Sequence, residues 1–465
     1  MTNTTLINKE NKIKNSFYKR IELIDTKDIN GNNEKIEKHT YEAFVKLQEA
    51  LLKENIIIGI DSAYRSEEHQ LKLYHEFIEM YGKEYADKIV APVGTSEHHS
   101  GLAIDIALKV NGEYLDADVV HEEDEPIFKK IHAHLKDYGF ILRYPEGKEN
   151  ITGDPYEPWH IRYVGEIPAK IIAENNYTLE EYLEEFSGVL LVNKEKDMTS
   201  FDVVNKISHL FGIKRVGHTG TLDPLAEGVL LVAIGKATKV VELLTATYKE
   251  YIAEVKLGIK TDTLDITGKV LETTQVPELN HLEEALLSFK KTYLQEVPIY
   301  SAVKVNGKKL YEYARNNEVV ELPKKEVTIK EIELLNKTND TFTFKTLVSK
   351  GCYIRSLIND IATSLNTYGT MTSLVRTKQG KVSIENTIKI SDIENNDYTL
   401  YNIDEVLEIP IIGVDEETER KIRFGQHLLN EYNIQDKVIF KNKNNQILGI
   451  YELKNDELVV WKNFV

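Results

Sequence analysis

The sequence predicts a chain of several α+β domains, and three observations support this fold class. The chain has 465 residues, which is too many for one ordinary hydrophobic core, so two or three domains are expected. Apolar residues make up 42% and charged residues 29% of the chain, a composition typical of globular proteins. Helical and strand patterns alternate without a regular repeat, and this mixed order indicates α+β architecture.

The first predicted domain covers residues 1–187. The apolar run in "IIIGIDSAYRS" predicts a strand with a polar tip. The pattern after it predicts a helix that begins at Ser66, a good N-cap, and ends at Gly82. Two more strands and a closing helix are expected at "GLAIDIAL", "WHIRYVG" and "IPAKIIAENNYTLEEYLEEF".

The second predicted domain covers residues 188–395, and the third covers 396–465. The β-branched run in "SGVLLVNKEKD" predicts the first strand of the second domain, and "TSFDVVNKISHLFG" predicts a capped helix after it. The polar stretch "SDIENNDYTLYN" marks the end of this domain. Short alternating strands such as "KVIFK" and "QILGIYEL" then predict a small β-rich module.

The charge of the chain is unevenly distributed. The net charge of −17 argues against nucleic-acid binding by the whole chain. Residues 1–187 hold 22 basic and 36 acidic side chains (−14), and residues 391–465 hold 8 and 15 (−7). Residues 188–390 hold 28 basic and 24 acidic side chains (+4). The middle region is therefore the only plausible binder of a polyanion such as RNA.

The composition also indicates where the protein acts. Its one cysteine, Cys352, excludes an intrachain disulfide and a cysteine-based zinc cluster. No run approaches the roughly 18 apolar residues of a membrane helix. The polar start "MTNTTLINKENKIKNSFYKRIELI" has no apolar signal-peptide core. We therefore expect a cytoplasmic protein with no membrane contact.

One group of residues has the composition of a hydrolytic metal site. Such a zinc site needs three ligands from His, Asp or Glu and one open position. "SEHHSGLAID" supplies His98 and Asp105, and "YEPWHIRY" supplies His160. Glu157 lies where a general base would take a proton from water, and Arg65 could stabilise an oxyanion. The alternative is that the His–Asp pair is a coincidence at the surface.

These stretches, together with "YGFILRYPEGKENITGDPYEPWHIRYVG", resemble the zinc D,D-carboxypeptidases of the VanY and VanXY type over roughly residues 50–165. The family patterns SxHxxGxAxD and ExxH occur in order. The resemblance implies a small mixed or antiparallel sheet and a peptide or peptidoglycan precursor ending in D-Ala-D-Ala as substrate. Without an export signal, the chain is closer to the cytoplasmic VanXY type. The implied site has zinc ligands His98, Asp105 and His160, the base Glu157, the oxyanion partner Arg65, and Ser96 orienting the terminal carboxylate.

A second candidate site centres on one aspartate. In "RVGHTGTLDPLAEGVL", Asp223 lies in a turn of small and glycine residues between two apolar runs. It could form an Asx-turn before Pro224. It could also be a catalytic carboxylate held at a cleft. The local sequence alone leaves both interpretations open.

Five ordered motifs between about Gly188 and Arg376 resemble the TruB family of tRNA pseudouridine synthases. The motifs are "GHTGTLDPLAEG", "TATYKEYIAEVKLGIKTDTLDITG", "LQEVPIYSAVKVNGKKLYEYAR", "SKGCYIRSLIND" and "MTSLVRT". The resemblance implies an α/β domain with a central mixed sheet, followed by a PUA-like module at 396–465. It implies conversion of uridine-55 in the TΨC loop of tRNA to pseudouridine, with no cofactor.

This resemblance also implies the site residues. The uridine must leave its stack to reach a pocket. Asp223 would act on its ribose, either at C1′ or on the C2′ proton, and must be ionised. Arg355 would keep it so by pairing with it, against the effect of desolvation. Tyr251 would stack on the base, and the expected RNA-binding residues are His218, Lys194, Tyr353 and Leu374.

One motif departs from the TruB pattern. Where the family has "DKPxGxTS", this chain has "NKEKDMTS" at residues 193–200. Lys194, Thr199 and Ser200 are kept, so we expect a reshaped loop with weaker RNA docking and intact chemistry.

The sequence therefore predicts one chain with two enzymes, a tRNA pseudouridine synthase and a zinc D-alanyl-D-alanine carboxypeptidase or dipeptidase. The alternative is that only one half is catalytic and that the other binds RNA or a peptidoglycan precursor. The complete sets of catalytic residues in both halves argue against this alternative.

Overall fold

The structure is a computed structural model that describes residues 3–115 and 124–465. The chain forms two units. Met1–Phe186 and Asn205–Arg215 make the first unit, and Ser187–Val204 and Val216–Val465 make the second. The sequence did not indicate that Asn205–Arg215 would group with the first unit. The three predicted domain ranges remain predictions.

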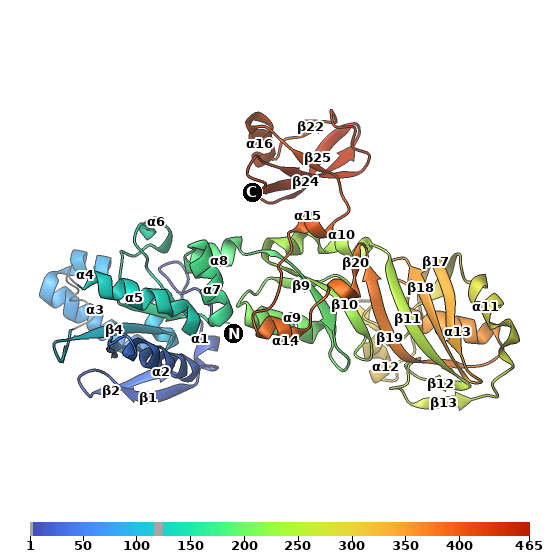
Figure 1. Cartoon of the computed structure of the whole chain (residues 1–465), viewed down its shortest axis with the longest axis horizontal. Coiled ribbons are helices and arrows are strands. Elements are labelled where there is room, and N and C mark those ends of the chain that lie inside the picture. The colour runs from blue at the N-terminus through green and yellow to red at the C-terminus, as the bar shows by residue number, and fades with distance from the viewer. Residues whose placement is uncertain (1–2, 116–123) are drawn as a thin grey trace. The chain divides into compact units, whose positions relative to one another are not determined.

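A small antiparallel sheet is the centre of the first unit (Figure 1). Its strand order is β3-β4-β7-β6, and β5 pairs with β4. The apolar faces of helices α2 and α5 cover it, with Phe44, Leu47 and Ile131 fully buried in the shared core. The strands are β3 (Ile58–Ser62), β4 (Ala103–Val110), β5 (Glu113–Tyr114), β6 (Phe140–Leu142) and β7 (His160–Tyr163), beside the separate hairpin β1 (Leu23–Lys27) and β2 (Asn33–Glu37).

Two helices were predicted for this unit, and one of them forms with the predicted limits. Helix α3 is capped by Ser66, whose hydroxyl accepts the N–H of His69, and it ends before Gly82 at φ 84°. The pattern predicted as one helix over 167–186 forms two helices, because Asn176 adopts φ 51° and Thr178 starts a new capping box. The helices are α1 (Asn15–Tyr18), α2 (Lys38–Leu52), α3 (Glu67–Tyr81), α4 (Lys83–Ile89), α5 (Glu125–Leu135), α6 (Glu149–Thr152), α7 (Glu166–Asn175) and α8 (Leu179–Glu185).

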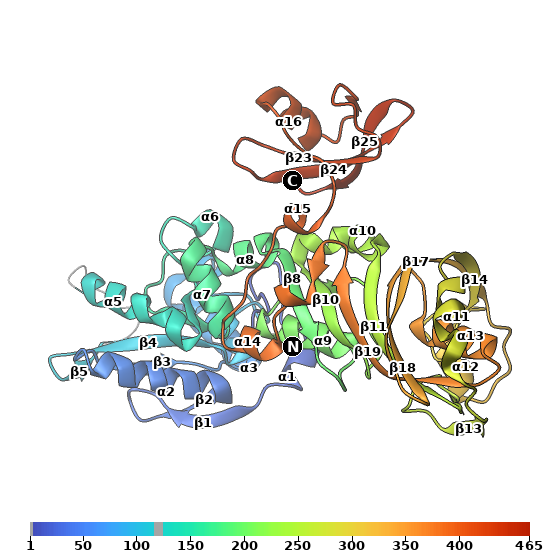
Figure 2. The same cartoon turned by 45° about the vertical axis from the view of Figure 1, so that its right-hand side comes forward.

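A nine-stranded mixed sheet is the centre of the second unit. Figure 2 shows its main strands side by side in the order β14-β17-β18-β11-β19-β10-β8. It is mixed because β10 and β19 run parallel while the other neighbours are antiparallel. The strands are β8 (Gly188–Lys194), β9 (Val216–His218), β10 (Glu227–Ile234), β11 (Lys249–Leu257), β14 (Thr292–Glu296), β17 (Lys324–Lys337), β18 (Thr341–Val348), β19 (Gly369–Gln379) and β20 (Val382–Ser383).

Helices and two small hairpins surround this sheet. Helix α13 packs its apolar face on the sheet, with Leu357, Ile358 and Ile361 fully buried. The helices are α10 (Val241–Ala246), α11 (Leu282–Ser288), α12 (Leu310–Arg315), α13 (Ile354–Ser364), α14 (Ile390–Glu394), α15 (Ile403–Val406) and α9 (Ser200–Leu210), of which residues 200–204 belong to this unit. The hairpins are β12 (Ile259–Thr261) with β13 (Val270–Thr273) and β15 (Lys304–Val305) with β16 (Lys308–Lys309).

The last segment forms the predicted β-rich module. Its five strands have the order β21-β23-β24-β25-β22, and helix α16 packs against β24. Val438, Phe440, Leu448 and Tyr451 form its own core. The elements are β21 (Ile411–Gly413), α16 (Glu416–Arg423), β22 (Leu428–Leu429), β23 (Lys437–Lys441), β24 (Ile447–Lys454) and β25 (Glu457–Asn463).

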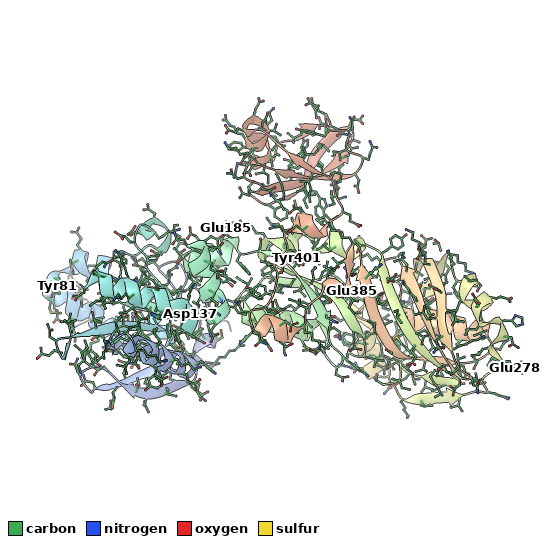
Figure 3. All side chains as sticks on the ribbon, viewed as in Figure 1. Tyr81, Asp137, Glu185, Glu278, Glu385 and Tyr401 are labelled. Atoms are coloured by element: carbon green, nitrogen blue, oxygen red, sulfur yellow. The ribbon has the colours of Figure 1, made fainter. Side chains whose placement is uncertain are left out.

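The predicted α+β fold class is confirmed, with an antiparallel first sheet, a mixed central sheet and a β-rich end. Polar and aromatic side chains such as Tyr81 and Glu278 lie at the surface (Figure 3). Within the described residues, no helix is both long and apolar enough to cross a membrane.

Candidate active sites

Two neighbouring strands and a short helical turn bring the three predicted metal ligands together. His98 lies on the 3₁₀ turn Glu97–Ser100, which ends at Gly101 in the left-handed region, so the chain can turn back into β4. Asp105 of β4 is directly opposite His160 of β7. His98 Nε2 is 3.1 Å from Asp105 Oδ2, and His160 Nδ1 is 2.9 Å from Asp105 Oδ1. One ligand atom from each residue fits within 4.8 Å of the others.

The chemistry of these three residues fits zinc. The Nδ1–H of His98 donates to the Ala63 carbonyl at 2.6 Å, which leaves Nε2 available as a ligand. Burial lowers the pKa of His98 and so favours its neutral, ligating form. Although burial opposes it, His98 and His160 hold the pKa of Asp105 well below its usual range. Asp105 Oδ1 is buried, and apart from its ion pair with His160 it has no hydrogen-bond donor among the described residues, which fits an atom that would face a cation.

Glu157 lies beside this cluster with its carboxylate directed at the same space. Its Oε2 is 3.6 Å from His160 Nδ1. Burial raises the pKa of Glu157 to about 7, an effect that His160 partly offsets and Asp105 reinforces. A carboxylate with this pKa can both accept and return a proton near neutral pH, as a general base must.

All six residues predicted for the peptidase line one cavity of about 180 Å³. Arg65 is held at its wall by hydrogen bonds from its guanidinium to Ser62 Oγ (3.1 Å) and Gln70 Oε1 (3.2 Å). Ser96 lies in the same wall and is 6% exposed. The cavity therefore combines a metal-binding cluster, a carboxylate and a fixed positive charge.

The second site lies in the second unit, on the loop between β9 and β10. The Ala226 N–H donates to the Asp223 carbonyl (3.0 Å), and the Asp197 N–H donates to the Pro224 carbonyl (2.8 Å), so the loop is held on both sides. The Asp223 carboxylate meets the Arg355 guanidinium at two points, Oδ2 to Nε at 2.8 Å and Oδ1 to Nη2 at 3.2 Å. Such a bidentate pair fixes both orientation and charge.

Arg355 has little freedom to leave this position. It lies in the first turn of α13 and is 5% exposed. Its Nη1 donates to the Thr263 carbonyl (2.9 Å) and its Nη2 to the Tyr300 carbonyl (3.0 Å). Burial raises the pKa of Asp223, while Arg355 opposes this shift. The pair forms part of the wall of a cavity of about 380 Å³ that Tyr251, Tyr353 and Leu374 also line.

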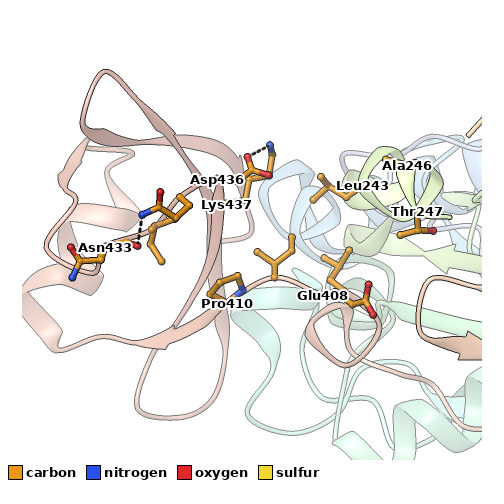
Figure 4. Close-up of a pocket in the computed structure, with 12 residues that line it drawn as sticks. Leu243, Ala246, Thr247, Glu408, Pro410, Asn433, Asp436 and Lys437 are labelled. Carbon is orange, nitrogen blue, oxygen red and sulfur yellow. Dashed lines mark hydrogen bonds and ion pairs between the residues drawn. The ribbon is translucent and has the colours of Figure 1, made fainter. Parts of the chain in front are cut away.

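A further cavity of about 470 Å³ lies next to α10 and the loops 407–410 and 433–437 (Figure 4). Leu243, Ala246 and Pro410 form part of its wall, and Lys437 pairs with Asp436 at its edge. Of the predicted site residues, all of which the structure describes, none lines this cavity. It is therefore separate from the metal cluster and from the Asp223–Arg355 pair.

Comparison with known proteins identifies the family to which the second half of the chain is similar. Residues 208–354 match the model of the TruB family pseudouridylate synthase N-terminal domain. The tRNA pseudouridine synthase B of Caldanaerobacter subterraneus subsp. tengcongensis is 43% identical over 255 residues, covering 54% of this chain and 90% of that protein. The enzyme of the same name from Bacillus anthracis is 42% identical over 282 residues, covering 57% of this chain and 92% of that protein. The chain belongs to the TruB family.

The first unit matches a different family. Residues 33–166 match the model of VanY, D-alanyl-D-alanine carboxypeptidase. A vancomycin-resistance D,D-pentapeptidase VanY, solved in complex with Zn(II), is 30% identical, with 39% of this chain and 99% of that chain covered and a TM-score of 0.33. The predicted fusion is confirmed. Residues 3–186 are called the VanY-type part below, and residues 187–465 the TruB part.

Two predicted RNA-binding residues of the TruB part lie outside its cavity. Lys194 is fully buried in β8, and its ammonium donates to the carbonyls of Glu195 (2.8 Å) and Pro224 (3.4 Å). Its side chain therefore supports the Asp223 loop, and the RNA contact predicted for Lys194 stays a prediction. His218 is half-buried at the end of β9, where its Nδ1 accepts the Gly220 N–H (3.3 Å).

Sequence reasoning missed several residues of both sites. In the TruB part, the fully buried Arg376 lines the cavity and donates to the carbonyls of Val229 (2.6 Å) and Gly220 (3.1 Å). Lys249 also lines it, and burial together with Arg376 lowers its pKa to about 8. In the VanY-type part, Glu97 lies buried next to His160. The only sign in the sequence that Glu97 belongs to the site was its position directly before His98.

Proposed function

We propose that the TruB part converts the uridine at position 55 in the TΨC loop of tRNA to pseudouridine. The observation that carries this proposal is the bidentate Asp223–Arg355 pair at the wall of a cavity lined by aromatic and apolar side chains. A base swung out of its stack needs such a pocket. About one third of the Asp223 side chain is exposed, so a substrate ribose can reach it.

The proposed chemistry uses side chains of this chain. Arg355 keeps Asp223 ionised and oriented, and Asp223 then acts on the ribose, either at C1′ or on the C2′ proton. The N1–C1′ bond breaks, the base turns, and a C5–C1′ bond forms, which displaces any bond that Asp223 has made to C1′. The C5 proton leaves to solvent and N1 takes up a proton, so the product is an isomer of uridine. Tyr251, nearly buried in β11, supplies a ring on which the base can stack. Tyr353 and Leu374 line the same cavity, and His218 and Lys194 are proposed as further RNA-binding residues outside it.

The substitution Asp223→Asn tests this proposal. Loss of the charge should lower the rate of pseudouridine formation by about 10³-fold or more, the scale seen when a catalytic group is removed. The readout is tritium released to water from the C5 position of a labelled tRNA or TΨC stem-loop. Asp397→Asn, at an exposed position outside the cavity, is the matched control and should keep the full rate. An active Asp223→Asn enzyme would refute the assignment, and activity on another tRNA position would refute the TΨC loop.

We further propose that the VanY-type part removes D-alanine from peptides ending in D-Ala-D-Ala and that it requires zinc. The observation in support is the buried His98, Asp105 and His160 cluster with Glu157 beside it. When bound there, zinc would supply Lewis-acid activation of water and of the scissile carbonyl. Because tRNA and peptidoglycan precursors are both found in the cytoplasm, we place both reactions there.

The residues of this chain would divide the remaining work. Glu157 takes a proton from the attacking water and returns it to the amine of the leaving D-alanine. Arg65 compensates the negative charge that develops on the scissile carbonyl oxygen. Ser96 lies in the same wall, and its hydroxyl would donate a hydrogen bond to the terminal carboxylate of the peptide.

Metal removal tests the peptidase proposal. The full chain, stripped with a chelator and dialysed, should release no D-alanine from a D-Ala-D-Ala peptide, and stoichiometric zinc should restore release. Amino-acid analysis of the products measures it. If the purified chain binds no metal, or if no metal restores hydrolysis, the VanY-type part is a binding module and the proposal fails.

A further inference from the structure

A series of buried ion pairs connects the metal cluster with helix α8. Glu97 is 2% exposed and lies on the far side of His160 from Asp105. Its Oε2 is 3.7 Å from His160 Nε2. Both atoms are buried, and neither has a hydrogen-bond partner among the described residues. Buried polar atoms are nearly always satisfied, so two facing atoms without partners indicate a contact that closes in another state of the site.

Binding of a metal ion by His160 would favour a hydrogen bond between His160 Nε2 and Glu97 Oε2. If His160 presents Nδ1 to a metal, its proton must lie on Nε2, and that N–H points at Glu97 Oε2. A carboxylate that accepts the outer N–H of a ligating histidine fixes the tautomer and the ring orientation. Glu97 therefore has the position of such a carboxylate toward His160.

Two arginines hold Glu97 in this position. Its Oε1 accepts hydrogen bonds from Arg143 Nε at 2.8 Å and from Arg162 Nη1 at 2.6 Å. Both arginine side chains are fully buried. One carboxylate does not balance two guanidinium charges, and an uncompensated buried charge is strongly destabilising.

Helix α8 supplies the missing negative charge. Glu180 binds Arg143 at two points, Oε2 to Nη1 at 3.0 Å and Oε1 to Nη2 at 2.6 Å. The carboxylate of Glu180 lies mostly buried, at 15% exposure. Glu180 lies outside residues 33–166, the range that matches the VanY family. The balance of charge behind the metal cluster thus depends on a helix beyond the family domain.

We propose that Glu97 and Glu180 are positioning residues for the metal site of the VanY-type part, acting through His160 and Arg143 respectively. This inference rests on the proposed zinc site. Without Glu180, Glu97 would be the only one of these two carboxylates that compensates the charge of Arg143. The Glu97 carboxylate is then drawn toward Arg143 and away from His160 Nε2, so the ligand loses its outer support.

Zinc affinity of the full chain tests the inference without substrate. Metal-free protein is titrated with Zn²⁺ against a chromogenic chelator, and with Co²⁺ to record the visible spectrum of the bound ion. E97Q should weaken zinc binding about 10–100-fold, the range for loss of such outer partners, and E180Q about tenfold. Both should alter the Co²⁺ spectrum. E184Q, an exposed glutamate on the same helix, should bind zinc like the unchanged chain.

The remaining outcomes separate this inference from its alternatives. Equal zinc affinity in E180Q and E184Q would overturn it, and a lower unfolding temperature with unchanged zinc affinity would show that Glu180 is only structural.

If E180Q is too unstable to purify, R143M/E180M removes both charges together. It should bind zinc more tightly than E97Q and more weakly than the unchanged chain, and full affinity would overturn the inference. A chain that binds zinc but releases no D-alanine would refute the proposed peptidase and leave this inference standing.

Discussion

At the scale of single residues, the two carboxylates of the metal site show how surroundings assign roles. Asp105 and Glu157 both lie close to His160, yet their pKa values shift in opposite directions. Two histidines hold Asp105 ionised despite its burial, as a metal ligand must be. Burial dominates at Glu157 and raises its pKa to about 7. Opposite shifts of neighbouring acids are typical of sites that divide ligand and base roles.

This difference predicts the pH dependence of D-alanine release. Glu157 must be ionised to accept a proton, so kcat/KM should fall as pH drops through its pKa. Because a bound cation lowers the pKa of a nearby carboxyl, the midpoint should lie between about 4.5 and about 7, the ordinary and the shifted values for Glu157. A pH series with saturating zinc measures the midpoint, and Glu157→Gln should remove nearly all activity. A rate that stays flat down to pH 4.5 would contradict this role.

At the scale of elements, the close parallel pairing of β10 and β19 shapes the wall of the TruB cavity. Gly228 of β10 is paired with Arg376 of β19. Gly228 has φ +103°, and a Cβ atom there would lie 2.3 Å from the Arg376 carbonyl oxygen. Only glycine allows the two strands to approach this closely. Arg376 is thereby held where it lines the cavity.

The substitution Gly228→Ala should therefore destabilise the TruB part. The positive φ and the backbone clash together should cost about 1–3 kcal/mol or more, which would lower the unfolding temperature measured by calorimetry or circular dichroism. Pseudouridine formation should fall with it, because Arg376 must move. Gly413→Ala is the matched control, since its Cβ would meet no atom within 4 Å and its φ is not in the positive range. Equal unfolding temperatures for both variants would contradict the role of this close approach.

Elements also show where sequence patterns succeed and fail. The limits of α3 followed from Ser66 and Gly82, because caps are local signals. The pattern over 167–186 indicated one helix, but Asn176 in the left-handed region breaks it. Helical periodicity continues across such a break, since both helices bury the same kind of face. The break matters because it starts α8, which carries Glu180.

At the scale of the whole molecule, the catalytic motifs could be predicted from the sequence, but the buried residues that hold them in position could not. His98 and Asp105 lie on one short stretch, and Asp223 lies in one loop, so local patterns indicated both. Glu97, Arg143, Arg162 and Glu180 come from four distant segments, and only the tertiary fold brings them into contact. Buried Lys194 illustrates the same limit, because a lysine in an RNA-binding motif gives no sign of the direction of its side chain.

The metal cluster and the Asp223–Arg355 pair lie in different units and use different chemistry, so the proposed activities should respond separately to metal removal. The chelated chain that fails to release D-alanine should still form pseudouridine at its full rate, because the Asp223–Arg355 site contains no cluster of metal ligands among the described residues. Both assays on one sample measure this. A parallel loss of both activities would contradict separate function.

The contact of Arg162 with the start of the chain has a practical consequence for recombinant production. The carbonyls of Asn3 and Thr5 accept hydrogen bonds from Arg162 Nη2 at 2.8 and 3.0 Å. A purification tag fused directly ahead of these residues, or a protease scar that replaces them, would disturb a guanidinium that holds Glu97. Preparations meant for metal analysis should therefore keep residues 3–5 native and separate any leader sequence from them by a flexible spacer.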